Sequence, residues 1–176
     1  VDVTTLTVGN TVANVAFTNN LTVTNAISFA NDGALTFSND GATRSFNGGI
    51  TTTSVGGTVT LSGTLQTSND VITLGSVSLV GNTTIDTNAT STTGDITIGS
   101  VSGGSNTLTL STGDNIANAD ITVSGAIDQR NYKLANMLVN NELTEAVIEF
   151  AYQGPLLKLK NGKINFAITG DILFNI

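Results

Sequence analysis

A three-residue unit recurs along the chain and limits what it can fold into: an apolar residue, then Thr or Ser, then a second apolar residue. Alternation with a period of two places both apolar side chains on one face of a strand and the hydroxyl on the other. Each unit therefore predicts a short strand that is buried on one side. The units are Leu6-Thr7-Val8, Leu21-Thr22-Val23, Ile27-Ser28-Phe29, Leu35-Thr36-Phe37, Val59-Thr60-Leu61, Ile72-Thr73-Leu74, Val77-Ser78-Leu79, Ile96-Thr97-Ile98, Leu108-Thr109-Leu110 and Ile121-Thr122-Val123.

Turn-forming residues separate these units. Pairs such as Gly9-Asn10, Gly56-Gly57 and Gly103-Gly104 stand between them, and Gly and Asn tolerate the backbone angles of tight turns. The units recur about every dozen residues, which is typical of many short strands joined by turns. We predict an all-β fold.

Two all-β architectures fit this cadence. In a β-solenoid, or parallel β-helix, two or three short strands make one coil and the coils stack in parallel. In a β-sandwich, the alternative, the same strands pair antiparallel in two sheets. The small uncharged outward residues favour the solenoid, because they stack on copies of themselves without electrostatic cost.

The composition excludes several classes of partner and site. Only 11% of the residues are charged and the formal net charge is −7, so the clustered Lys and Arg that a nucleic acid partner requires are missing. The chain has no Cys and no His, which excludes disulfides and thiolate metal sites. No run of about 18 apolar residues occurs, so we expect no transmembrane segment.

Stretches 55–65 and 106–110, read as VGGTVTLSGTL and NTLTL, resemble the passenger regions of bacterial autotransporters and filamentous-haemagglutinin-like exoproteins. The resemblance extends over residues 1–127. It implies a β-helical stalk that is secreted or displayed on a bacterial cell surface, commonly in adhesion. The implied partner is a host or neighbouring cell surface.

The composition changes near Asp128, and we divide the chain there into a β-solenoid repeat region, residues 1–127, and a C-terminal segment, residues 128–176. All three Glu and five of the six basic residues lie beyond this point. Because a repeat stack needs an atypical end to cover its core and strand edge, we predict that residues 128–176 form a cap or a subunit-joining β-meander.

Local patterns suggest how the C-terminal segment folds. Asn161-Gly162 between the alternating runs 156–160 and 163–168 predicts an antiparallel hairpin with a two-residue turn. Residues 145–152 and 172–176 predict two further strands. Leu134, Met137 and Leu138 have helical spacing, which favours a short helix within residues 132–141.

Both termini carry apolar strands that lend themselves to self-association. A strand edge at one end can pair with a neighbouring subunit, and head-to-tail pairing produces filaments when the rotation does not close. The alternative is that both ends pair within the same molecule. We therefore expect the partner to be the chain itself, as a homo-oligomer or filament, or a cell surface. The candidate joining residues are Val1, Val3, Leu6, Val8, Ile164, Phe166, Ile168, Ile172, Phe174 and Ile176.

We expect no catalytic residues and no enzyme activity, because His and Cys are absent and a Ser-Lys pair would have to use Lys residues that are confined to the C-terminal segment. One alternative is a β-helical polysaccharide-active enzyme, a glycosidase or lyase, that uses paired Asp residues. We expect no cofactor; calcium at turn oxygens is a weak alternative. The acids of the repeat region are Asp2, Asp32, Asp40, Asp70, Asp86, Asp95, Asp114 and Asp120.

A further alternative is an ice-binding protein. Flat ladders of Thr-x-Thr triplets on one solenoid face resemble ice-binding surfaces. This reading requires the triplets to align on one face. They are Thr5-Leu6-Thr7, Thr22-Val23-Thr24, Thr58-Val59-Thr60 and Thr107-Leu108-Thr109.

Overall fold

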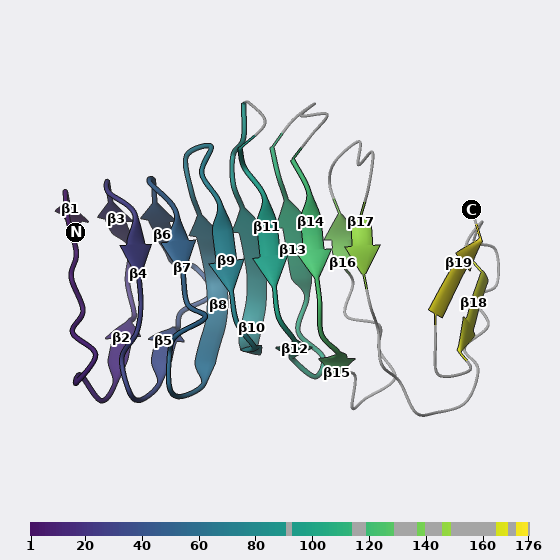
Figure 1. Cartoon of the computed structure of the whole chain (residues 1–176), viewed down its shortest axis with the longest axis horizontal. Coiled ribbons are helices and arrows are strands. Elements are labelled where there is room, and N and C mark those ends of the chain that lie inside the picture. The colour runs from purple at the N-terminus through teal and green to yellow at the C-terminus, as the bar shows by residue number, and fades with distance from the viewer. Residues whose placement is uncertain are drawn as a thin grey trace.

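The computed structural model describes residues 1–90, 93–113, 119–128, 137–139, 146–148, 165–168 and 172–175. All regular secondary structure among these residues is β-strand, which confirms the all-β prediction. Strands β1 to β17 stack in parallel as the coils of a β-solenoid, with the N-terminus at one end of the stack (Figure 1). The β-sandwich alternative is wrong, because its strands would pair antiparallel.

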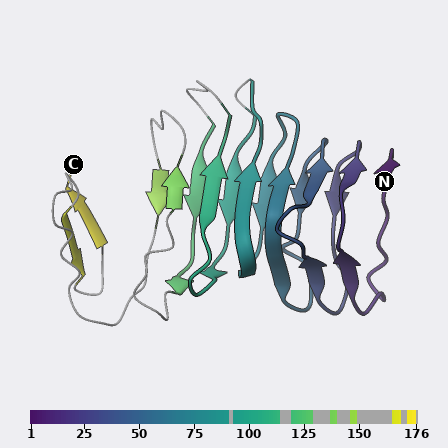
Figure 2. The ribbon, with the colours of Figure 1, turned by 180° about the vertical axis from the view of Figure 1, so that it is seen from behind.

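Each coil contributes strands to three faces, and the view from behind shows the ladders that Figure 1 partly hides (Figure 2). The first face holds β1 (Asp2–Val3), β3 (Leu21–Val23), β6 (Thr43–Phe46), the second halves of β8 (Val59–Gln66) and β10 (Val77–Asp86), β13 (Leu108–Ser111) and β16 (Met137–Val139). The second face holds β4 (Ile27–Ser28), β7 (Ile50–Thr51), β9 (Ile72–Leu74), β11 (Ile96–Ile98), β14 (Ile121–Val123) and β17 (Ala146–Ile148). The third face holds β2 (Val15–Phe17), β5 (Leu35–Phe37), the first halves of β8 and β10, β12 (Val101–Ser102) and β15 (Ile127–Asp128).

Successive coils stack in strict register on the second face. Ile50 lies opposite Ile72, Ile72 opposite Ile96, and Ile96 opposite Ile121. One turn of the solenoid therefore takes 22, 24 and 25 residues in these three steps. Equivalent residues share an environment, which explains why the same short unit recurs in the sequence.

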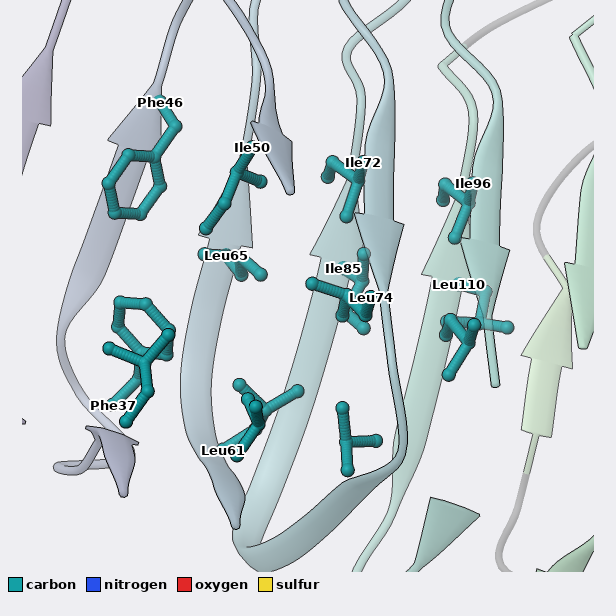
Figure 3. Close-up of a cluster of buried hydrophobic side chains, with 14 of the residues drawn as sticks. Phe37, Phe46, Ile50, Leu61, Leu65, Ile72, Leu74, Ile85, Ile96 and Leu110 are labelled. Carbon is teal, nitrogen blue, oxygen red and sulfur yellow. The ribbon is translucent and has the colours of Figure 1, made fainter. Parts of the chain in front are cut away.

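The interior is a continuous column of apolar side chains. Figure 3 shows Ile50, Ile72 and Ile96 following one another from coil to coil, with Leu65 and Ile85 facing them from the first face. All five are buried. Burial of apolar area of this kind is the main stabilising term available to a chain without Cys.

Four Phe rings fill the interior near the N-terminal end. The rings of Phe17 and Phe37 stack with centroids 5.5 Å apart, while Phe29 and Phe46 meet Phe37 edge to face. Offset-stacked and edge-to-face pairs are the geometries that aromatic quadrupoles favour. Aromatic side chains thus occupy a bore that farther along the stack is filled by Leu, Ile and Val.

The C-terminal predictions have mixed outcomes. Strands β18 (Asn165–Ile168) and β19 (Ile172–Asn175) pair antiparallel, which confirms an antiparallel hairpin in this segment. The predicted arm 156–160 and its Asn161-Gly162 turn lie outside the described residues. The parallel ladder also continues beyond residue 127, since β16 pairs with β13 and β17 with β14.

The predicted helix within residues 132–141 is wrong where the structure describes it. Residues 137–139 form β16, which continues the first face in parallel to β13. The helical spacing of Leu134, Met137 and Leu138 was outweighed by pairing with an existing ladder, since tertiary contacts override the weak signal of a short apolar run.

Candidate functional site

The longest regular feature of the outer surface is a column of hydroxyls on the second face. From β4 to β14, each strand of this face turns one Ser or Thr outward, and neighbours stand one coil apart in the ladder; in β17 the register position holds Val147. Parallel strands lie about 4.8 Å apart, so the column repeats at about that spacing. Its members are Ser28, Thr51, Thr73, Thr97 and Thr122.

The other two faces carry hydroxyl columns as well. Thr36, Thr60, Ser78 and Ser102 form one on the third face. Thr43, Thr64, Thr84 and Thr109 form one on the first face. All eight side chains are half-buried. A second column on the first face is mixed, because Gln66 and Asp86 interrupt Thr22, Ser45 and Ser111.

Asn side chains tie neighbouring coils together at the turns. Backbone N–H groups donate to the Oδ1 atoms of Asn14, Asn20 and Asn82, at 2.9, 2.9 and 3.0 Å, and each bond joins residues on successive coils. In the opposite sense, Asn88 Nδ2 donates to the carbonyl of Thr67 at 3.0 Å. The abundance of Asn thus reflects bonding between coils as well as turn formation.

The Thr-x-Thr triplets do not line up on one face. Thr58 and Thr60 lie at the third face, while Thr107 and Thr109 lie at the first. Thr22 is on the first face too, but its column is the mixed one. Triplet alignment therefore gives no support to an ice-binding surface.

The Asp residues of the repeat region are distributed around the coils. Among those that the structure describes, only Asp95 and Asp120 occupy equivalent positions on adjacent coils, and the backbone N–H of Asp120 donates to Asp95 Oδ1 at 3.0 Å. Asp86 accepts from the backbone N–H of Asn88 at 2.8 Å, as expected of a turn acid. Asp114 lies outside the described residues.

No group of three or more His, Cys, Asp and Glu suited to a metal ion occurs in the part of the chain that the structure describes. The weak calcium prediction therefore gains no support from the geometry. Among the same residues, no helix is long and apolar enough to cross a membrane.

Arg44 is a buried cation in the interior, which the sequence patterns did not single out. Its side chain is fully buried and follows Leu21 in one inward column. The guanidinium donates to backbone carbonyls of Ser62 at 2.7 Å, of Phe17 at 3.2 Å and of Ser38. Burial lowers the pKa of this guanidinium, because a low-dielectric interior disfavours its charged form.

The predicted joining residues of the N-terminus lie on the first coil. Val3, Leu6 and Val8 are half-buried and pack against the core, and Val1 is 83% exposed. The sequence patterns missed Val15 and Phe17. These two residues of the first coil are also half-buried and pack against the core. The alternation Val15-Ala16-Phe17 was the signal that would have found them.

The predicted joining residues of the C-terminus lie on the hairpin. Phe166 stands opposite Phe174 in the register of β18 and β19, and Ile168 stands opposite Ile172. Ile164 and Ile176 lie outside the described residues. Among the described strands, the hairpin is a separate two-stranded sheet, unpaired with the solenoid.

One family model matches the chain: the carboxyltransferase domain, subdomain A and B, over residues 119–174. The match covers less than half of the chain and begins in the coil that contains β14. The comparison with curated proteins gave no match, and neither did the comparison with solved structures.

The family match corrects one expectation. We expected no enzyme activity from the absence of His and Cys, and the match to a carboxyltransferase domain contradicts this. The absence of His and Cys removes the commonest catalytic groups but does not exclude chemistry by Arg and Lys, and five of the six basic residues lie in the matched segment.

Proposed function

We propose that the chain is an extracellular structural and adhesive module of a bacterial surface protein or fibre. The observation that carries the proposal is the set of in-register hydroxyl columns on a parallel stack, above all Ser28, Thr51, Thr73, Thr97 and Thr122. The resemblance of residues 1–127 to exoprotein passengers supports the same location.

The physical basis of adhesion would be multivalency. A single hydroxyl offers one weak hydrogen bond whose net contribution is about 1 kcal/mol. A column that repeats every coil offers many such bonds at once to a partner surface, and linked weak contacts raise the overall affinity strongly. The continuous backbone ladder would hold the hydroxyls at fixed positions, so little ordering would be required on contact.

Introduction of positive charge on the second face tests this proposal. The double variant Thr73→Lys/Thr97→Lys places two like charges one coil apart on the outer surface, where they interrupt the hydroxyl column. Beads coated with the variant should bind bacterial or host cells at least about tenfold more weakly than beads with the parent chain, about 1.4 kcal/mol.

The matched control is Thr73→Ser/Thr97→Ser, which keeps both hydroxyls and should bind as the parent does. Circular dichroism would verify that both variants fold. Equal binding by the lysine variant and the parent would reject adhesion through this face, and absence of binding by the parent to any cell surface would reject the adhesive function.

Carboxyl-group transfer is a second candidate, favoured by the match of residues 119–174. Arg130, Lys133, Lys158, Lys160 and Lys163 lie in this segment, and Arg and Lys are the side chains that bind carboxylates. Incubation of the full chain with donors labelled in the carboxyl carbon would test it. Movement of label to an acceptor would support the activity, and a panel without any transfer would reject it.

A further inference from the structure

The first face carries a second regular surface, which the proposed adhesive column does not use. Two outward columns run side by side over four strands, β6, the second halves of β8 and β10, and β13, in register from coil to coil. Neighbours within a column lie about 4.8 Å apart, and the two columns lie about 6.6 Å apart because their members on one strand are separated by two residues. We call these eight half-buried polar side chains the first-face array. Its members are Thr43, Thr64, Thr84 and Thr109 in one column and Ser45, Gln66, Asp86 and Ser111 in the other.

Hydrogen bonds within the molecule orient the two longest side chains of the first-face array. Gln66 Nε2 donates to Ser45 Oγ at 2.9 Å, and Asp86 Oδ1 accepts from the backbone N–H of Asn88 at 2.8 Å. Among the described residues, no group bonds to Gln66 Oε1 or to Asp86 Oδ2. Gln66 and Asp86 are register partners on adjacent coils. Two oriented acceptors therefore stand one coil apart, and a ligand must supply donors to both.

The surroundings of the first-face array exclude several classes of ligand. Arg44 is the only basic side chain of residues 1–128 and it is buried, so an anionic ligand would meet Asp86 without a compensating positive charge. The four Phe residues of the same range pack in the interior and leave no ring for an apolar partner on this face. Seven of the eight array members are neutral groups that donate as well as accept. A ligand that only donates, such as a cation without hydroxyls, would use half of this capacity.

We propose that the first-face array binds a neutral linear polysaccharide, whose chain lies along the axis of the stack. Sugar hydroxyls both donate and accept, as the hydroxyl and amide groups of the array do. Each ring of an extended chain of β-linked hexoses advances by close to one coil spacing, so successive sugars meet successive strands. Neighbouring hydroxyls of one sugar donate to Asp86 Oδ2 and Gln66 Oε1, and the bond to the carboxylate is the stronger one because it is charge-assisted.

Titration of the isotope-labelled full chain with two neutral β-linked probes, cellotetraose and mannotetraose, tests the site. Amide chemical shifts followed by NMR should move saturably with at least one probe. The largest changes should map to the second halves of β8 and β10 and to β13. Absence of saturable shifts with both probes would overturn the proposal, and so would shifts confined to the second or third face.

The length of the sugar chain gives a second readout, because each further sugar reaches another strand of the array. Linked weak hydrogen bonds raise affinity together, so cellotetraose should bind at least about tenfold more tightly than cellobiose. Spermine, a linear cation without hydroxyls, should not displace cellotetraose. Equal dissociation constants for the two sugars, or displacement by spermine at equal concentration, would reject an extended site that selects hydroxyls.

A single charge removal locates the site. Asp86→Asn keeps the size of the side chain and an oxygen for the Asn88 N–H but loses the charge, so cellotetraose should bind about fivefold more weakly. The matched control is Asp95→Asn, because Asp95 also accepts a backbone N–H, from Asp120 at 3.0 Å, but immediately precedes β11 on the second face. The control should bind as the parent does. An Asp86→Asn variant that also binds as the parent does would overturn the proposal.

A hydroxyl deletion tests the other column without a change of charge. Thr84→Val keeps a β-branched side chain on the strand and should weaken binding of cellotetraose about fivefold, the usual worth of one net hydrogen bond. Thr60→Val makes the same change on the third face and should have no effect. A loss of affinity in Thr60→Val equal to that in Thr84→Val would place the sugar outside the first-face array.

The sugar site and the proposed adhesion through the second face fail separately. A chain that binds cellotetraose on the first face but adheres to no cell would keep the sugar site and lose the adhesive function. Beads that adhere to cells, with neither tetramer shifting the first-face amides, would reject the sugar site and keep adhesion.

Discussion

A single arginine links three coils in the interior of this protein. The Arg44 guanidinium bonds to carbonyls near the corner between the third and first faces, on Phe17, Ser38 and Ser62. The carbonyl of Phe17 also accepts from Ser38 N–H, whereas the guanidinium supplies partners for Ser38 and Ser62. A buried cation is costly unless its donors are satisfied. The carbonyls satisfy the two terminal nitrogens of the guanidinium, whereas the buried Nε has no hydrogen-bond partner.

Arg44→Met should destabilise the fold by about 2–4 kcal/mol. Met occupies similar volume, but it leaves two buried carbonyls without this donor, at about 1–3 kcal/mol each, and part of this is offset because a buried charge is removed. Urea unfolding followed by circular dichroism would measure the difference. Thr43→Ser, which keeps an outer hydroxyl next to Arg44, should remain near the parent; an Arg44→Met variant as stable as the parent would show that desolvation outweighs the hydrogen bonds.

Arg44 also shows what a sequence pattern can and cannot predict about a single residue. Thr43-Arg44-Ser45-Phe46 alternates, and Phe46 is inward, so a period of two already placed Arg44 on the buried side. The segment departs from the repeated unit because Arg44 stands where the unit has an apolar residue. The three carbonyls that satisfy the cation come from distant parts of the chain, which no local pattern reveals.

At the scale of the element, close stacking of turns is as necessary as burial of strands. A Cβ atom on Gly57 would lie 2.6 Å from the backbone carbon of Gly33 and 2.7 Å from the backbone nitrogen of Ala34, both on the preceding coil. The Gly57 N–H donates to the Gly33 carbonyl at 3.1 Å. Only glycine lets these two turns approach so closely.

Gly57→Ala should therefore cost about 1–3 kcal/mol, the usual range for an overpacked site. Gly41→Ala is the matched control, because its Cβ would have only the Asn39 Oδ1 atom near it, at 3.7 Å. Thermal unfolding of the two variants would be compared. Equal melting temperatures would contradict the close approach of the two turns.

Strand positions were more predictable than strand partners. The unit Ile72-Thr73-Leu74, for example, forms β9 with both apolar side chains buried. Its neighbours on the second face are β7 and β11, each one full coil away in the sequence, 22 residues from Ile50 to Ile72 and 24 residues from Ile72 to Ile96. Periodicity within a unit carries no information about them. For this reason the sequence left both a solenoid and a sandwich open. Leu6-Thr7-Val8 forms no strand, and Leu6 and Val8 pack against the core from an irregular segment.

At the scale of the molecule, three parallel ladders hold every outer column at a fixed spacing. The interior is continuous from the first coil to β14, and each coil pairs with the next on all three faces over most of this length. Backbone hydrogen bonds and packed side chains join each coil to its neighbours, and for this reason the stack resists bending. The adhesive function that we propose depends on that regularity.

The distance between two residues of one column tests this regular stack most directly. Ser28 and Thr122 lie four coils apart on the second face, so their Cα atoms should be about 19 Å apart at about 4.8 Å per coil. Nitroxide labels on Ser28→Cys/Thr122→Cys, measured by double electron–electron resonance in a dilute sample, should give one narrow distribution at that distance, extended by the label arms. A broad distribution, or a distance well beyond that reach, would contradict a rigid parallel solenoid.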